Sequence, residues 1–140
     1  QDVDLYGDWN LYEPDRLPVE KKGVLHFVDN WAFRAYTYLK KHEFTEGMPL
    51  GVVDDRYYDQ AEPIFILENS QTPDEVVGAS LSSPYYMKCD DELHGHISGT
   101  TIGVYYCGKG KLVINCYRIR DEIGTNPAAG QLLYNMIKNA

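Results

Sequence analysis

The sequence predicts a single α+β domain, or the sheet-rich part of an α/β sandwich, and three observations favour this class. Two β-branched and aromatic runs, 100–107 and 111–119, surround a glycine-rich turn, which is the pattern of a β-hairpin. Residues 126–137 begin with Asn-Pro and carry apolar residues at helical spacing. The apolar runs 63–68 and 75–81 have the composition of strands. Several strands followed by a terminal helix are typical of an α+β domain.

The N-terminal half of the chain is expected to contain a strand, a helix and a long loop. Residues 1–22 are polar and interrupted by prolines, but their aromatic residues indicate an extension that packs over the domain. The apolar run 23–28 predicts a short strand. Between residues 31 and 42 apolar and aromatic residues recur at helical spacing, which predicts a helix. Residues 43–61 are interrupted by Gly and Pro and are expected to form a loop.

The C-terminal hairpin is expected to bury one apolar face. If Cys107 pairs with Lys111, three apolar cross-strand pairs share that face. These pairs are Tyr106–Leu112, Val104–Ile114 and Ile102–Cys116. Cys107 and Cys116 then lie far apart on opposite faces, so no disulfide between them is expected, and Cys116 reads as a core residue. The following helix is expected to bury a stripe formed by Ala129, Leu132, Leu133, Met136 and Ile137.

Composition excludes several classes of partner. The 140 residues carry a formal net charge of -8, with 44% hydrophobic and 24% charged residues, as in ordinary globular domains. Nucleic acid and anionic membranes attract basic surfaces, so neither is expected as a partner. No apolar run approaches the roughly 20 residues of a membrane-spanning helix. The odd number of cysteines argues against a full disulfide framework, and the start at Gln1 indicates a processed chain or a fragment.

Two polar runs contain residue types that carry chemistry. The run from Cys89 to His96 combines a thiol, three carboxylates and a His-x-His pair that is able to bind zinc, but no second pair follows at finger-like spacing. Asp54, Asp55 and Asp59 are candidate calcium ligands or glycosidase carboxylates, but the spacing of a calcium loop is absent. Both runs are therefore expected to be solvated loops, without a metal or cofactor and without catalytic residues.

Aromatic residues are numerous enough to form a sugar-stacking platform, since the chain contains 12 tyrosines. The candidates are Trp9, Trp31, Tyr57, Tyr58, Tyr85, Tyr86, Tyr105 and Tyr117. Packing inside the domain is the expected role for most of them, because aromatic side chains carry much of the packing area of small domains.

Three short segments together carry a family resemblance. They are Gly-Lys-Gly with its apolar strand (108–115), the Asn-Pro-Ala-Ala start of the terminal helix with Leu-Leu-Tyr-Asn (126–135), and His-x-Phe-x-x-Gly-Met-Pro-x-Gly (42–51). The chain resembles the class I glutamine-amidotransferase-like domains at the C-terminal end of bacterial glycoside hydrolases of the β-galactosidase and rhamnosidase kinds. Glu43 stands where that family has proline. The resemblance implies a flavodoxin-like sandwich, a carbohydrate-active parent enzyme and a periplasmic or secreted setting.

Amidotransferase activity is not expected despite the resemblance. The active members place a nucleophilic cysteine on a Gly-x-Cys-x-Gly elbow, and none of Cys89, Cys107 and Cys116 has this context. The expected function is therefore a non-catalytic accessory domain, which acts in domain packing, in oligomerisation or in shaping a neighbouring glycosidase site. Two alternatives stay open. One is a small glycoside hydrolase that uses paired carboxylates, with Asp90, Asp91 and Glu92 as further candidates, and the other is a stand-alone glycan-binding module.

Overall fold

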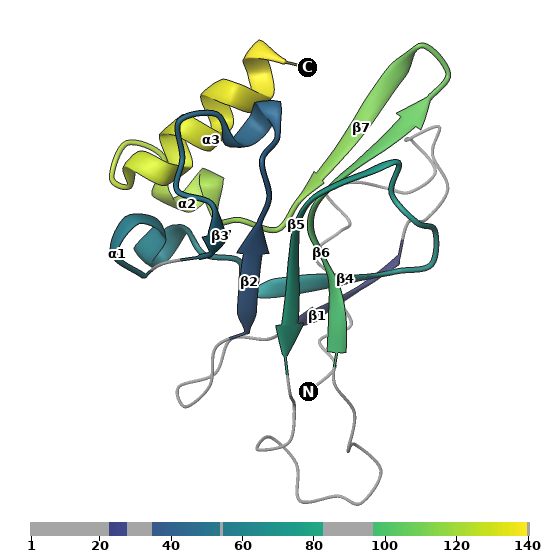
Figure 1. The fold of residues 1–140 in the computed structure, drawn as a ribbon, viewed down its shortest axis with the longest axis horizontal. Coiled ribbons are helices and arrows are strands. Elements are labelled where there is room, and N and C mark those ends of the chain that lie inside the picture. Colours follow the sequence, from purple (N-terminus) through teal and green to yellow (C-terminus); the bar gives the residue numbers. More distant parts are fainter. Residues whose placement is uncertain (1–22, 28–34, 54, 83–96, 140) are drawn as a thin grey trace, which may run out of the picture.

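A computed structural model describes residues 23–27, 35–53, 55–82 and 97–139. These residues form a mixed α+β structure around one sheet of seven strands in which every recorded pairing is antiparallel (Figure 1). The strands are β1 (Gly23–Phe27), β2 (Tyr36–Leu39), β3 (Gly51–Val52), β4 (Phe65–Asn69), β5 (Glu75–Ser82), β6 (Ile97–Cys107) and β7 (Gly110–Asn115). Their order is β1-β4-β6-β5-β2-β3, and β7 pairs with β6.

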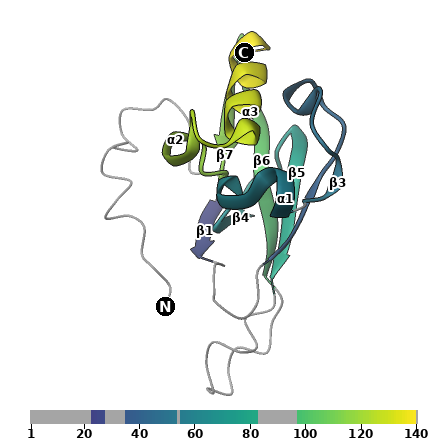
Figure 2. The ribbon, with the colours of Figure 1, turned by 90° about the vertical axis from the view of Figure 1, so that its left-hand side faces the viewer.

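The helices lie together on one face of this sheet, as Figure 2 shows from the helical side. They are α1 (Asp55–Tyr58), α2 (Ile119–Glu122), α3 (Pro127–Lys138) and the short 3-10 helices η3 (Glu43–Thr45) and η4 (Asp59–Ala61). The core fills the space between the helices and the sheet. Its fully buried members are Leu39, Phe44, Tyr58, Ala61, Val77, Ile102, Val104, Ala128, Ala129 and Leu132.

The central strand is β6, which pairs with β5 along one side and with both β4 and β7 along the other. The β5–β6 register shifts on both sides of Gly78, which marks a bulged region. A Cβ atom on Gly78 would lie 2.6 Å from the Thr101 Oγ1 and 2.9 Å from a Leu39 methyl carbon. Only glycine therefore lets β2, β5 and β6 approach as closely as they do here.

The predicted terminal hairpin is present, but its predicted register is wrong by one residue. Cys107 pairs with Gly110 rather than with Lys111, so Val104 faces Val113. The cause is a two-residue loop in which Gly108 takes a φ of 62°, as the first position of a type II′ turn requires. In this register Cys107 and Cys116 no longer lie on opposite faces, and both remain free thiols.

The second hairpin strand is also shorter than predicted, because Asn115 ends it. The Asn115 side chain accepts a hydrogen bond from the Tyr117 N–H at 3.3 Å and donates one to the Tyr117 carbonyl at 3.0 Å. These bonds turn the chain out of β7, and α2 then begins at Ile119.

The predicted terminal helix is confirmed as α3. The Asn126 side chain accepts hydrogen bonds from the N–H groups of Ala128 and Ala129, and Pro127 occupies the first turn. The predicted buried stripe needs one correction: Ile137 is 69% exposed, whereas Asn135 is buried.

The helix predicted over 31–42 is wrong wherever the structure describes that segment. Tyr36–Leu39 form β2, in which exposed and buried residues alternate, and they pair with β5. Helical spacing and strand alternation coincide in so short a segment, and pairing with β5 decides between them. Segment 43–61, predicted as a loop, contains η3, β3, α1 and η4. The predictions for residues 1–22 lie outside the described residues.

Candidate functional site

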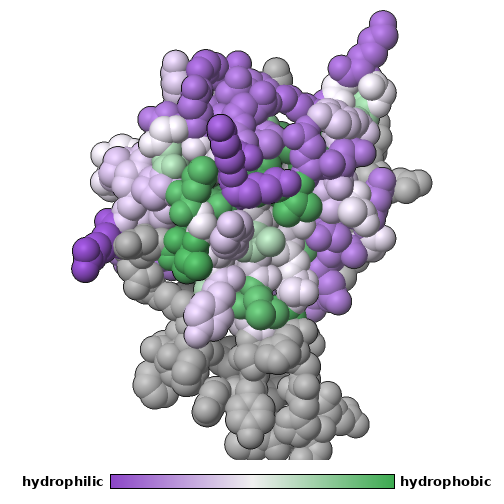
Figure 3. Space-filling view, viewed as in Figure 1, coloured by the Kyte–Doolittle hydropathy of each residue, from purple (hydrophilic) through white to green (hydrophobic). Residues whose placement is uncertain are grey.

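An apolar surface lies on the side of β2 that points away from the helices. It consists of Tyr36, Tyr38, Val52 and Leu81, and we call it the outer sheet face. Their exposed fractions are 78%, 55%, 70% and 44%. Cross-strand pairing brings them together, because Tyr38 pairs with Val52 and Tyr36 pairs with Leu81. In Figure 3 hydrophobic side chains on this side of the molecule lie in several groups, separated by paler and more hydrophilic ones.

The strands below this surface are held rigidly. On the buried side of β2 and β5, the hydroxyl oxygens of Thr37 and Ser80 lie 2.5 Å apart in a hydrogen bond. Leu39 on the same side is fully buried in the core. The Val53 N–H donates to the Thr37 carbonyl at 2.9 Å and extends the short β2–β3 ladder. The backbone that carries the outer sheet face is therefore fixed by strand pairing and by packing on its buried side.

A polar cluster lies at the other end of β5. The His42 Nε2 is 2.8 Å from the Glu75 Oε2, and the Tyr106 hydroxyl donates a hydrogen bond to the other carboxylate oxygen of Glu75. These two bonds, with the Tyr106 bond contributing most, hold the pKa of Glu75 below its usual value. Next to the cluster, Lys111 pairs with Glu43 at 3.3 Å.

The His42–Glu75 pair has the composition of a general-base dyad, but its geometry gives it a structural role. The Phe44 N–H donates to the His42 Nδ1 at 3.1 Å, which makes His42 the N-cap of η3. Nδ1 is therefore the unprotonated nitrogen, and Nε2 carries the proton that Glu75 accepts. Neither nitrogen is left to take a proton from a substrate.

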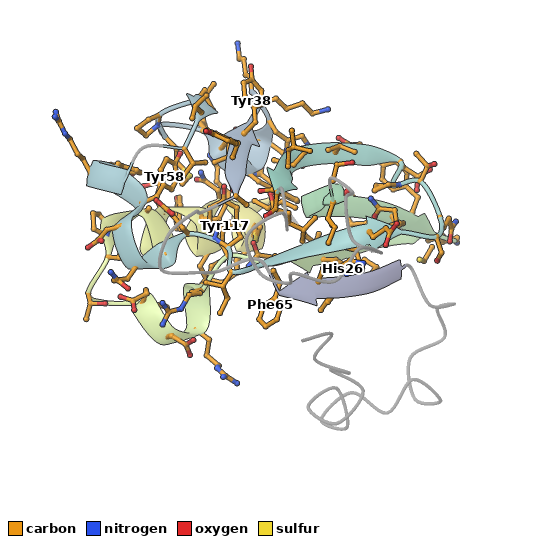
Figure 4. The ribbon with its side chains drawn as sticks, turned by 90° about the horizontal axis from the view of Figure 1, so that it is seen from below. His26, Tyr38, Tyr58, Phe65 and Tyr117 are labelled. Atoms are coloured by element: carbon orange, nitrogen blue, oxygen red, sulfur yellow. The ribbon has the colours of Figure 1, made fainter. Side chains whose placement is uncertain are left out.

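Three of the four aromatic candidates that the structure describes are buried, namely Tyr58, Tyr105 and Tyr117. Tyr58 stands between two tyrosines, with ring centroids 5.0 Å from Tyr57 and 6.2 Å from Tyr117. Burial raises the pKa of Tyr58 to about 12, with a smaller contribution from Tyr57. Burial also raises the pKa of Tyr117 well above its ordinary value. Tyr105 is buried and its hydroxyl donates to Asn69. Figure 4 shows Tyr58 and Tyr117 close together near the helices and Tyr38 apart from them.

The sequence did not identify Tyr36 and Tyr38, the two tyrosines that are exposed side by side on a strand. Both fell inside the predicted helix over 31–42, so their common face was not recognised. The signal was present in Tyr-Thr-Tyr-Leu, where aromatic and other side chains alternate with the period of a strand. The other candidates, Trp9, Trp31, Tyr85 and Tyr86, lie outside the described residues.

The predicted acidic and thiol candidates do not form a described site. Asp59 is exposed and accepts a hydrogen bond from Gln60, while Asp54 and the side chain of Asp55 lie outside the description. The run from Cys89 to His96, with its acidic residues, also lies outside it. Within the ranges that the structure describes, no group of three or more His, Cys, Asp or Glu residues is placed to hold a metal.

The thiol of Cys116 is not a nucleophile in this environment. Burial raises its pKa to about 12, which keeps the thiol protonated at physiological pH. Its sulfur lies 3.9 Å from the Thr100 carbonyl oxygen, in weak hydrogen-bonding contact.

Residues of the three motif segments contact one another through packing and capping. The Asn135 amide donates to the carbonyls of Phe44 at 3.0 Å and Glu46 at 2.9 Å, which joins α3 to η3. The Asn126 amide donates to the Tyr58 carbonyl at 2.9 Å and joins α3 to α1. The described motif residues therefore build the contact between the helices and the turn at 42–51.

Comparison with protein-family models, curated proteins and solved structures produced no match for this chain. Among the helices that the structure describes, none combines the length and apolar character needed to cross a membrane.

Proposed function

We propose that this chain is a non-catalytic accessory domain of a carbohydrate-active enzyme, and that it docks against a neighbouring domain through the outer sheet face. The observation that carries the docking role is the exposure of Tyr36, Tyr38, Val52 and Leu81 on one rigid surface. Contiguous apolar surface of this kind is typical of interfaces. The link to carbohydrate enzymes comes from the resemblance of the three motif segments.

The composition of the outer sheet face favours a protein partner. Val52 and Leu81 make up half of it, and aliphatic side chains offer a sugar no hydrogen bonds. Tyrosine is enriched and charged residues are depleted at the centre of protein interfaces, as in these four residues. A neighbouring domain would cover all four residues together.

The non-catalytic part of the proposal is supported by the roles of the motif residues. His42 caps η3, while Asn126 and Asn135 tie α3 to other elements. Residues used in this way stabilise a fold rather than react with a substrate.

The resemblance also implies a glutamine-amidotransferase-like, flavodoxin-like sandwich. The proposal does not extend to that topology. Such sandwiches are built on parallel strands, whereas the recorded pairings in this chain are antiparallel. The proposed kinship therefore rests on the motif segments and not on the topology of the sheet.

The test begins with the native polypeptide, purified with an antibody against this chain and assayed on aryl glycosides. A larger polypeptide that hydrolyses them is expected, and Val52→Gln in that polypeptide should lower its temperature of inactivation. Ile123→Gln at the end of α2, a position that is also exposed, is the matched control and should leave that temperature unchanged. A native polypeptide no larger than this chain and without glycosidase activity would contradict the proposal.

A second candidate function is glycan binding, and one observation favours it. Tyr36 and Tyr38 project from the same side of one strand, so their side chains are about 7 Å apart, and aromatic rings stack on the apolar faces of sugars. Affinity electrophoresis in polysaccharide gels would test it. Retardation that Tyr36→Ala and Tyr38→Ala abolish, while Val52→Gln retains it, would favour glycan binding over domain docking.

A further inference from the structure

The solvent-facing side of α3 forms a second apolar surface, separate from the outer sheet face. Tyr134 is 61% exposed and Ile137 is 69% exposed, while the opposite side of the helix buries Ala128, Ala129 and Leu132. Gly130 lies one turn before Tyr134 and two turns before Ile137, so the three residues share one side of the helix. We call these three residues the α3 outer face.

Nothing within the described chain requires glycine at position 130. Its φ is not positive, and a Cβ atom built on it meets no atom within 4 Å. Glycine inside a helix costs about 1 kcal/mol relative to alanine. No contact within the described chain accounts for this cost. Close approach of another backbone or of a large side chain at this point would account for it.

We propose that the α3 outer face is a homodimer contact, in which two copies of α3 pack antiparallel and Tyr134 of each copy sits over Gly130 of the other. Twofold contacts require that residue i meets residue j and that j meets i. Gly130 and Tyr134 lie one helical turn apart on the same side of α3. An antiparallel pair can therefore place the Tyr134 side chain of each copy against the Gly130 of the other copy.

The charges on α3 favour the antiparallel arrangement. Lys138 is the one charged residue of α3, and it lies at the C-terminal end, paired with Glu46 at 3.1 Å. An antiparallel pair places the two Lys138 side chains at opposite ends of the contact. A parallel pair would bring these like charges together, which is destabilising. In the antiparallel pair Ile137 of one copy meets Pro127 of the other, so apolar contact extends along the helix.

Sedimentation velocity of the full chain over a wide concentration range tests the proposal. The wild-type chain is expected to show a concentration-dependent monomer–dimer equilibrium, because small interfaces give weak association. Gly130→Gln fills the space that Tyr134 needs and is expected to weaken dimerisation by about tenfold or more. Tyr134→Ala is expected to weaken it similarly.

Two controls separate this proposal from the function proposed above. Thermal melting followed by circular dichroism should show that Gly130→Gln folds at least as stably as the wild type, because glutamine is the better helix former. Val52→Gln on the outer sheet face should leave dimerisation unchanged. A wild-type chain that stays monomeric at every concentration, or a Gly130→Gln chain that dimerises normally, overturns the proposal. A dimer that only Val52→Gln disrupts also overturns it, and assigns self-association to the outer sheet face.

Discussion

Asn135 is a buried polar side chain that joins the terminal helix to the turn after β2. It is 1% exposed, donates to two backbone carbonyls and accepts a hydrogen bond from Gln131 at 3.0 Å. Asn135→Ala is expected to lower the free energy of unfolding by about 2–4 kcal/mol, because the carbonyls of Phe44 and Glu46 lose their buried donor. Urea denaturation measures this change. Gln131→Ala is the control and should cost much less, since both carbonyls keep their donor.

Tyr106 and Glu75 provide a prediction about acid stability. A carboxyl whose pKa is lowered in the folded state contributes stability that is present at neutral pH and is lost as the pH falls through the folded pKa. Tyr106→Phe removes the largest cause of the lowered pKa of Glu75, so that pKa is expected to rise toward its ordinary value. Carboxyl titration by NMR would show the rise. An unchanged titration of Glu75 in Tyr106→Phe would contradict the assigned hydrogen bond.

Tyr58 provides the corresponding prediction at alkaline pH. Burial raises its pKa to about 12, whereas the pKa of tyrosine in an unfolded chain is about 10. The folded state therefore holds the proton more tightly, and this stability is present below the unfolded pKa and is lost as pH rises through the folded pKa. The free energy of unfolding should fall between these two pKa values. In Tyr58→Phe the fall should be shallower. Chemical denaturation at a series of alkaline pH values measures it.

Among the elements, the crossing of β2, β5 and β6 leaves no room for a side chain at Gly78. Gly78→Ala is expected to destabilise the chain by about 1–3 kcal/mol, because the new methyl group meets Thr101 and Leu39 at distances too short for contact. Gly110→Ala is the matched control in the same sheet, since the nearest atom to its built Cβ is 3.8 Å away. Urea midpoints of the two variants make the comparison. Equal midpoints would contradict the close crossing.

Elements with local signals could be predicted from the sequence, and elements decided by distant pairing could not. The hairpin and α3 carry their signals in their own residues, namely the turn at Gly108 and the cap at Asn126. The register of the hairpin failed because either of two loop lengths satisfies the apolar pattern. β2 failed because four residues are too few to separate a helix from a strand until β5 supplies hydrogen bonds.

The candidate site was less predictable than the fold for a related reason. The outer sheet face joins residues from β2, β3 and β5, which only the pairing of strands brings together. The apolar spacing predicts that His42 ends a helix. Its contact with Glu75 spans 33 positions, so no local pattern indicates it. The expectation that most aromatic residues serve packing is confirmed for Tyr58, Tyr105 and Tyr117.

For the whole molecule, the outer sheet face predicts a solvent-exposed binding surface for apolar probes. The wild-type chain is expected to enhance the fluorescence of a hydrophobic dye in its folded state. Val52→Gln with Leu81→Gln should remove most of this enhancement, because two of the four apolar side chains are replaced. The melting temperature should change little, since both positions are exposed. Dye fluorescence that the double variant leaves unchanged would show that another surface binds the dye.

The hydrogen bonds between the end of the chain around α3 and the turn at 42–46 also bear on the order in which the chain is synthesised and folds. Asn135 reaches Phe44 across 91 positions, and Asn139 reaches Glu43 across 96. A ribosome therefore releases Phe44 and Met48 long before it releases the helix that covers them. Until α3 emerges, the growing chain exposes these apolar residues and the unpaired carbonyls beside them, which makes the nascent chain a substrate for chaperones. Contacts of such long separation also slow folding, and α3 completes a core whose other half was synthesised earlier.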